Sequence, residues 1–232
     1  MFDPSSRGRL TERDLARFAG RTLFDRVARV VCRAQCLPRK ELYEAWEVAR
    51  RVRRLLRGGR VVDLAGGHGL LAQVMLLLDA SSPEALVVDT VLPASRAALH
   101  AELCRAWPRL EHQVRFTQAR LGDVRLLPDD VVVSSHACGH LTDAVLELAA
   151  RVGARVAVLP CCHDARANDA GPLAGWVDAP LAIDIMRAVQ LEQRGYRVWT
   201  QTIPSSITPK NRLLIAQPQS QQHTVSTRQS RT

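Results

Sequence analysis

Two short stretches concentrate the residue types that can do chemistry, His136-Ala-Cys138-Gly-His140 and Cys161-Cys162-His163. Imidazole and thiol groups can move protons, attack an electrophile or bind a metal ion. His136 could accept a proton from an incoming hydroxyl or amine, because an imidazole titrates near neutral pH. We take His136, Cys138, Cys161 and His163 as the candidate catalytic residues.

Two other roles stay open for this set. The two cysteines and two histidines could form a tetrahedral zinc site, but His-x-Cys followed by Cys-Cys-His is not the spacing of a usual zinc knuckle. We therefore assign no metal ligand from the sequence. Cys161, which follows a proline, could instead attack carbon 6 of a pyrimidine base. A packing role for Cys138 and Cys162 is compatible with each of these.

Both stretches follow short apolar runs that alternate with helical patterns. The runs predict strands at 60–64, 84–89, 113–118, 130–135, 154–159, 196–203 and 212–217, and helices at 11–36, 39–57, 70–78, 94–107, 141–152 and 180–194. Such alternation is typical of an α/β fold with a mostly parallel sheet covered on both faces. The last two strands have no helix between them, which predicts an antiparallel pair.

A glycine-rich loop follows the first strand, in the run Asp63-Leu-Ala65-Gly66-Gly67-His-Gly69. Ligands of parallel sheets bind beyond the carboxyl ends of the strands, and missing Cβ atoms let a ligand approach the backbone. Asp89 ends the second strand, where a carboxylate can accept hydrogen bonds from both ribose hydroxyls of a nucleoside. Asp123 follows the third strand and is either a further ligand-binding acid or a turn residue.

The loop resembles the Asp-x-Gly-x-Gly-x-Gly pattern of class I methyltransferases that use S-adenosylmethionine (SAM), with alanine at the first glycine position. The resemblance implies a Rossmann-like seven-stranded sheet with its last strand antiparallel, preceded here by a helical extension. It also implies SAM as cofactor, held by Asp63, Ala65, Gly66, Gly67, Gly69, Asp89 and Asp123. Asp123 takes the family position of an acid that meets the adenine amino group.

A second resemblance covers about residues 58–165. His136, Cys138, Gly139, Thr142 and Asp143, followed by Cys161, Cys162 and His163, are similar to motifs of tRNA 2′-O-methyltransferases and related methyltransferase-like proteins. The resemblance implies methyl transfer to RNA, either tRNA or rRNA. A protein or small-molecule acceptor, or a non-catalytic module that binds SAM or RNA, are the alternatives.

The domain boundaries and partners are also predicted. We expect a helical extension at 1–57, a methyltransferase domain at 58–217 and a disordered tail at 218–232. The net charge of +9 permits an RNA partner, but nearly all the basic residues are arginines, which codon bias could also produce. Helix 39–57 carries arginines and aromatics on one face, which could hold a phosphate backbone and stack a base: Tyr43, Trp46, Arg50, Arg53, Arg54 and Arg57.

The remaining features concern location and two minor motifs. No apolar run is long enough for a membrane span and the cysteines do not suggest a disulfide framework, so we expect a cytoplasmic protein with no membrane partner. Cys32 and Cys36 fit buried small apolar residues. Lys210, one of two lysines, either faces an acidic substrate or completes a turn. The oligomeric state is not indicated.

Overall fold

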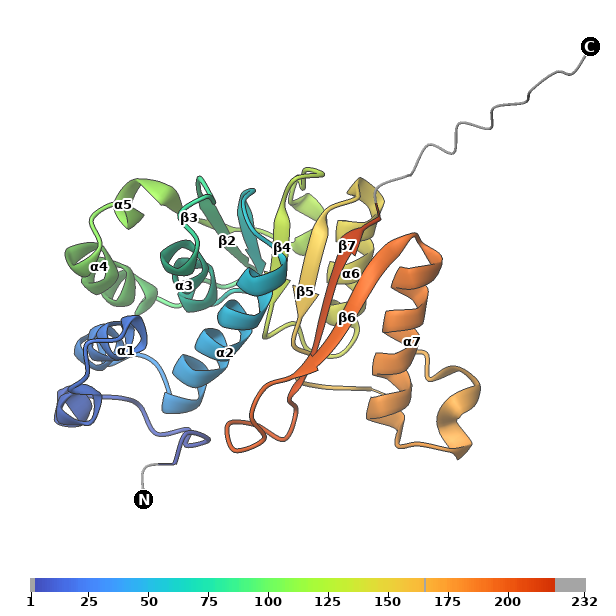
Figure 1. Ribbon diagram of the computed structural model, residues 1–232, viewed down its shortest axis with the longest axis horizontal. Coiled ribbons are helices and arrows are strands. Elements are labelled where there is room, and N and C mark those ends of the chain that lie inside the picture. Colours follow the sequence, from blue (N-terminus) through green and yellow to red (C-terminus); the bar gives the residue numbers. More distant parts are fainter. Residues whose placement is uncertain (1–2, 165, 220–232) are drawn as a thin grey trace, which may run out of the picture.

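A computed structural model describes residues 3–164 and 166–219. Within these residues seven strands form one sheet in the order β3-β2-β1-β4-β5-β7-β6 (Figure 1). The strands are β1 (Val61–Leu64), β2 (Ala85–Asp89), β3 (Val114–Gln118), β4 (Val131–Ser134), β5 (Arg155–Val158), β6 (Tyr196–Thr202) and β7 (Arg212–Pro218). Strands β1 to β5 pair in parallel, and β7 runs antiparallel to both β5 and β6. The predicted α/β fold with an antiparallel last strand is confirmed.

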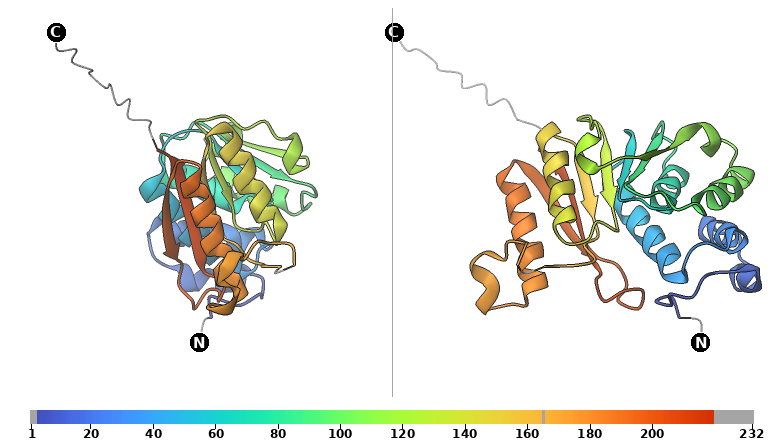
Figure 2. Two further views of the ribbon diagram at one scale, coloured as in Figure 1. Left: turned by 90° about the vertical axis from the view of Figure 1, so that its right-hand side faces the viewer. Right: turned by 180° about the vertical axis from the view of Figure 1, so that it is seen from behind.

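Helices cover both faces of the sheet, because the central strands are apolar on both sides. Val61 packs into the core on one face and Val62 into the core on the other. The first face is covered by the helices of the first half of the chain, and the second by α6 and α7 (Figure 2). The helices are α1 (Leu23–Ala34), α2 (Arg39–Leu55), α3 (Leu70–Leu78), α4 (Arg96–Ala106), α5 (Leu110–Gln113), α6 (His140–Val152) and α7 (Ala179–Gln193), with short 3-10 helices η1 (Glu12–Phe18), η2 (Leu121–Asp123) and η3 (Gly171–Gly175).

The single helix predicted for residues 11–36 is wrong. The chain forms η1, breaks, and starts again as α1 at Leu23. A capping box at Thr22 starts α1: Thr22 Oγ1 accepts from the backbone N–H of Asp25 at 3.1 Å, and the Asp25 carboxylate accepts from the Thr22 N–H at 3.2 Å. The N-terminal extension therefore consists of three helical segments.

The extension packs closely on the rest of the fold. Buried residues of η1, α1 and α2 belong to the same apolar core as residues of β1, β2 and β4. Cys32 and Cys36 are buried in this core, as expected. No helix of the described residues is long and apolar enough to cross a membrane. Most of the predicted disordered tail, from residue 220 on, lies outside the described residues, so this prediction is not tested.

One edge of the sheet collects the segments that matter for function. The carboxyl ends of β1 to β5 lie there, together with the start of α2 and the β6–β7 connection, at the bottom of Figure 1. Parallel strands place their following loops at one edge, so both chemistry-bearing stretches of the sequence meet the glycine loop there.

Candidate active site

The glycine loop between β1 and α3 is packed tightly against neighbouring strands. A Cβ on Gly66 would come within 2.8 Å of both Asp63 Cγ and Val87 Cγ1. Gly69 has φ +71°, and a Cβ there would lie 2.8 Å from Val87 and 2.9 Å from the Phe116 ring. Both positions therefore require glycine, one for space and the other for space and backbone conformation.

Ala65 departs from the pattern of the loop. It stands where the resembled family has its first glycine, and its φ is +56°. The left-handed region costs a residue with a Cβ about 1–2 kcal/mol. The loop geometry is thus maintained at Ala65 against a local strain.

A pocket of about 180 Å³ opens beside this loop. The residues that line it come from the start of α2, the glycine loop, the end of β2 and the loop after β4: Leu37, Glu41, Ala45, Asp63, Ala65, Gly66, Gly67, His68, Leu70, Leu71, Asp89, Ser135 and His136. Five of the seven predicted cofactor residues are in this set. The volume is below the roughly 300 Å³ typical of the smallest ligand pockets, so a nucleoside-sized ligand would extend onto the open surface.

Asp89 lines the pocket and fixes the glycine loop. Its Oδ2 accepts a hydrogen bond from the backbone N–H of Gly67 at 3.0 Å, and its Oδ1 accepts from the Val91 N–H at 3.3 Å. The carboxylate is therefore held in place before any ligand arrives. Asp123 is exposed in η2 and does not line the pocket. It follows β3, the neighbour of β2 in the sheet, and its helix η2 contacts α6.

Two acids of the pocket are influenced by burial. Asp63 is fully buried, and burial raises its pKa to about 7, opposed by the Ala72 N–H and reinforced by the charge of Asp89. Burial also raises the pKa of Glu41, while the nearby His136 lowers it. Carboxyl groups therefore lie on two walls of the pocket, and burial favours the protonated form of both.

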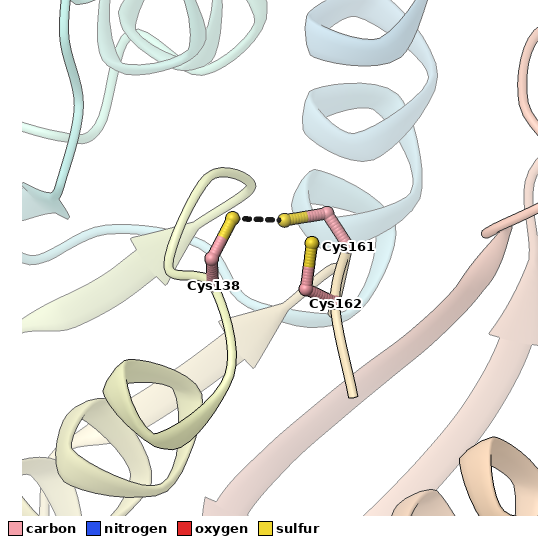
Figure 3. A group of neighbouring side chains, drawn as sticks. All are labelled: Cys138, Cys161 and Cys162. Atoms are coloured by element: carbon pink, nitrogen blue, oxygen red, sulfur yellow. Dashed lines mark hydrogen bonds between the residues drawn. The ribbon is translucent and has the colours of Figure 1, made fainter. Parts of the chain in front are cut away.

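The second chemistry-bearing region lies next to this pocket. His136 lines it, and Cys138 follows two residues later in the same loop. Cys138 Sγ lies 2.7 Å from Cys161 Sγ, and Cys162 points into the same space (Figure 3). The structure thus brings two of the four candidate catalytic residues, Cys138 and Cys161, together with Cys162.

His163 is placed differently. Its side chain is 5% exposed, and its Nε2 lies 2.7 Å from Asp184 Oδ1 on α7. Arg187 Nη1 donates to the same oxygen at 3.2 Å, and Arg187 Nε donates to Asp143 Oδ1 at 2.6 Å. In this arrangement His163 and Asp143 anchor their loops to α7, and neither lines the pocket.

The thiol environments differ in a way that bears on nucleophilic catalysis. Burial and the neighbouring thiol of Cys138 raise the pKa of Cys161, so this thiol stays protonated at neutral pH. Hydrogen bonding from Cys138 and the nearby Lys210 ammonium lower the pKa of Cys162. Cys162, which the sequence did not single out as reactive, is the more acidic of the adjacent pair.

The arginine–aromatic face of α2 is not the open surface that its sequence suggested. Arg53 is 3% exposed and donates to the Met75 carbonyl and to Ser82. The Tyr43 and Trp46 rings each pack against Phe24, with ring centroids 5.2 Å apart. The prediction of an RNA contact is therefore wrong for the buried Arg53, whereas Tyr43 and Trp46 are half-buried and the prediction stays open for them.

Comparison with known proteins identifies the fold family. A family model described as a methyltransferase domain matches residues 40–168, more than half of the chain. The chain belongs to this family. The match contains the glycine loop, Asp89, Asp123, His136 and both cysteine-bearing loops of the methyltransferase domain.

Solved structures support the same fold for this methyltransferase domain. An O-methyltransferase family protein from Burkholderia thailandensis is 19% identical, with a TM-score of 0.52, over 91% of this chain and 64% of that chain. The methyltransferase domain of bacterial CtHen1-C is 17% identical, with a TM-score of 0.52, over 78% of this chain and all of that chain (100%). At such identities the likeness shows the fold alone. No curated protein sequence matched the chain.

The methyltransferase pocket also contains residues that the sequence did not indicate. Glu41 is on α2, whose sequence suggested only an RNA-binding face of arginines and aromatics, and its entry into the pocket depends on how α2 packs. Ser135 and His68 are adjacent to predicted site residues, and proximity in sequence was the available signal for both. No local pattern marks Glu41, since its spacing from Glu44 and Glu47 is that of an ordinary polar helix face.

Proposed function

We propose that this methyltransferase domain binds SAM in the pocket beside the glycine loop and transfers its methyl group to RNA. The observation that carries the cofactor assignment is the Asp89 carboxylate, fixed at the end of β2 by the Gly67 N–H at 3.0 Å. An acid in this position is suited to accept hydrogen bonds from ribose hydroxyls. The family match supports the reaction type.

The residues present fit the cofactor. Gly67, where a Cβ would meet nothing within 4 Å, leaves space beside the loop, and a bound ammonium or sulfonium group of SAM would favour the ionised form of the Asp63 and Glu41 carboxyl groups. The pocket is too small for the whole cofactor, so in our proposal the adenine lies on the open surface and Asp123 is the acid that meets its amino group. Bound SAM would supply a methyl group on a positively charged sulfur, which is already a good leaving group.

The acceptor side of the pocket contains His136. In our proposal its imidazole accepts the proton that an acceptor hydroxyl or amine loses on methylation. Glu41 lies close enough to His136 for the histidine to lower the pKa of Glu41 against the effect of burial, and both side chains line the pocket. Positioning of the acceptor would supply much of the remaining acceleration.

RNA is the acceptor that the charges around the pocket favour. Arg9 is exposed, and its charge contributes with burial to lowering the pKa of His68, a residue of the pocket lining. Lys210 Nζ lies 3.7 Å from Cys162 Sγ in the loop after β5. Cationic side chains near the mouth of the pocket suit a phosphate backbone, and the motif resemblance points to the same class of acceptor.

The test uses methyl-labelled SAM with separate pools of tRNA, rRNA, protein and small metabolites. We expect label in an RNA pool, located by mass spectrometry of the nucleosides. Label confined to protein or metabolites would refute the RNA proposal but would support methyl transfer from SAM to another acceptor. SAM binding by calorimetry without turnover in any pool would indicate a binding module.

A matched pair of charge reversals tests the RNA surface. Arg9→Glu should weaken RNA binding and lower the salt dependence of its affinity, by about one unit of slope for each lost phosphate contact. Arg125→Glu is the control, because Arg125 is exposed but lies beside Arg60 at the opposite edge of the sheet. Equal losses in the two variants would show that the effect is only one of net charge.

A further inference from the structure

Three cysteines from two loops form a compact group of sulfur atoms. The sulfur atoms of Cys138, Cys161 and Cys162 all lie within 4.8 Å of one another. Cys138 follows β4 and the other two follow β5, so the group forms only when the sheet places these strands side by side (Figure 3). All three residues are free thiols in the structure.

We propose that Cys138, Cys161 and Cys162 bind one zinc ion through their three sulfur atoms. This donor set differs from the Cys/His combination suggested by the sequence, because His163 is engaged by Asp184 at 2.7 Å. Three sulfur ligands suit a thiophilic ion. A site of three protein ligands with an exposed side leaves a fourth position for water.

The distances permit such an ion after a small adjustment. Zinc–sulfur bonds of about 2.3 Å in tetrahedral geometry hold sulfur atoms about 3.8 Å apart. Cys138 and Cys161 lie 2.7 Å apart and would have to separate by about 1 Å. Cys138 is exposed, so nothing packed around it prevents a rotation of its side chain.

The two loops are fixed at the spacing that the ion requires. The Gly139 N–H donates to the Cys162 carbonyl at 3.3 Å, which joins one loop directly to the other. Arg187 is 3% exposed and donates to the Gly139 carbonyl at 3.3 Å and to Asp184 at 3.2 Å. Asp184 also binds His163, so Arg187 and Asp184 on α7 anchor both ligand-bearing loops. Fixed ligand loops lower the entropy cost of closing a metal site.

Charge provides an independent argument. Three thiolates and one zinc ion carry a net charge of −1, which a nearby cation would stabilise. The Lys210 Nζ lies 3.7 Å from Cys162 Sγ. Arg212 Nε donates to Asp184 Oδ2 at 2.6 Å, and this contact fixes the start of β7 two residues after Lys210. The site therefore gives a role to one of the two lysines of the chain.

The inference goes beyond the proposed function, because it concerns a site next to the SAM pocket. Cys138 is two residues from His136, which lines that pocket. A bound ion would hold the loop carrying His136 against the loop after β5. Metal content and SAM binding are measured separately, so either proposal can fail alone.

The first experiment measures metal in the full chain purified without chelators. We expect about one equivalent of zinc per chain by plasma mass spectrometry, lost in Cys138→Ser, Cys161→Ser and Cys162→Ser. Cys104→Ser is the matched control, since Cys104 is a half-buried free cysteine on α4 outside the group. Zinc retained when all three ligands are replaced together would overturn the proposal, and one equivalent of copper would overturn the choice of zinc.

The second experiment needs no variant and so does not depend on variant folding. Chelator-stripped wild-type protein is titrated with Co²⁺, and an intense thiolate-to-cobalt absorption band is expected at one equivalent. Zinc should then protect the three cysteines, but not Cys104, from iodoacetamide in peptide mass mapping. Absence of the band and of protection overturns the proposal. Loss of two hydrogen masses through a Cys138–Cys161 disulfide in protein freshly purified with oxidants excluded would also overturn it.

Discussion

Asp63 is expected to make the stability of the protein depend on pH in an unusual direction. Its side chain is 1% exposed, and burial raises its pKa from 3.8 to about 7. Because the folded pKa lies above the unfolded one, the folded state is favoured while the carboxyl is protonated. This contribution is complete below about pH 4 and is lost as the pH rises towards about 7.

The size of the effect follows from the two pKa values. The difference between 3.8 and about 7 corresponds to about 4 kcal/mol of unfolding free energy at 1.36 kcal/mol per unit. In the wild type, the Ala72 N–H donates a hydrogen bond to Asp63 Oδ2 at 3.3 Å. Asp63→Asn removes the charge at every pH and keeps a side-chain oxygen that can accept this hydrogen bond. The variant should match the wild type at about pH 4 and exceed it by up to about 4 kcal/mol at about pH 8.

Urea unfolding at a series of pH values measures this difference directly. Asp129→Asn is the control, because it removes the same charge from an exposed side chain and should shift stability little at any pH. If the difference between Asp63→Asn and wild type stays constant from about pH 4 to about pH 8, the burial of an ionisable carboxyl at this position is refuted.

Three further predictions concern the pocket and the extension. Asp89→Ala should weaken SAM binding about 10- to 100-fold in calorimetry, as expected for lost hydrogen bonds to a charged group, with Asp129→Ala unchanged; equal affinities would remove Asp89 from the site. Ala65→Gly should raise the free energy of unfolding by up to about 1 kcal/mol, since relief of the left-handed strain exceeds the entropy cost of glycine; a loss of stability would contradict this. Arg53→Ala should destabilise the fold by about 3–5 kcal/mol in urea unfolding, because it breaks the buried ion pair of Arg53 with Asp79 at 3.4 Å, whereas the exposed Arg54→Ala should change stability by less than about 0.5 kcal/mol.

The fold could be derived from the sequence to a large extent. Continuous apolar runs such as Val131–Val133 can be stable only between two covered faces, so the alternation of strands and helices predicted the sheet. The glycine loop could be predicted equally well, because Gly66 and Gly69 are required by contacts with a strand that the same alternation predicts. The break between η1 and α1 was missed, although Thr22 and Asp25 have the spacing of a capping box.

Only some residues of the candidate site could be predicted from the sequence. Asp89 and His136 could be found because Asp89 ends β2 and His136 follows β4, and the parallel sheet places both strand ends at one edge. Glu41 could not, since its entry into the pocket depends on the packing of α2. The same packing buries Arg53 and turns Tyr43 and Trp46 towards Phe24, which the polarity of a helix face does not reveal.

The sequence by itself determined the order of the elements, the glycine loop and the set of residue types at the carboxyl edge of the sheet. These depend on local propensity and on periodicity, which act over a few neighbouring residues. Tertiary structure alone decided which of those residues share a space. It separated His163 from the cysteines through Asp184 and brought Cys138 beside Cys161, 23 residues away in the chain. Contacts between loops depend on how strands and helices pack, and no short-range sequence pattern determines the distance between residues of two different loops.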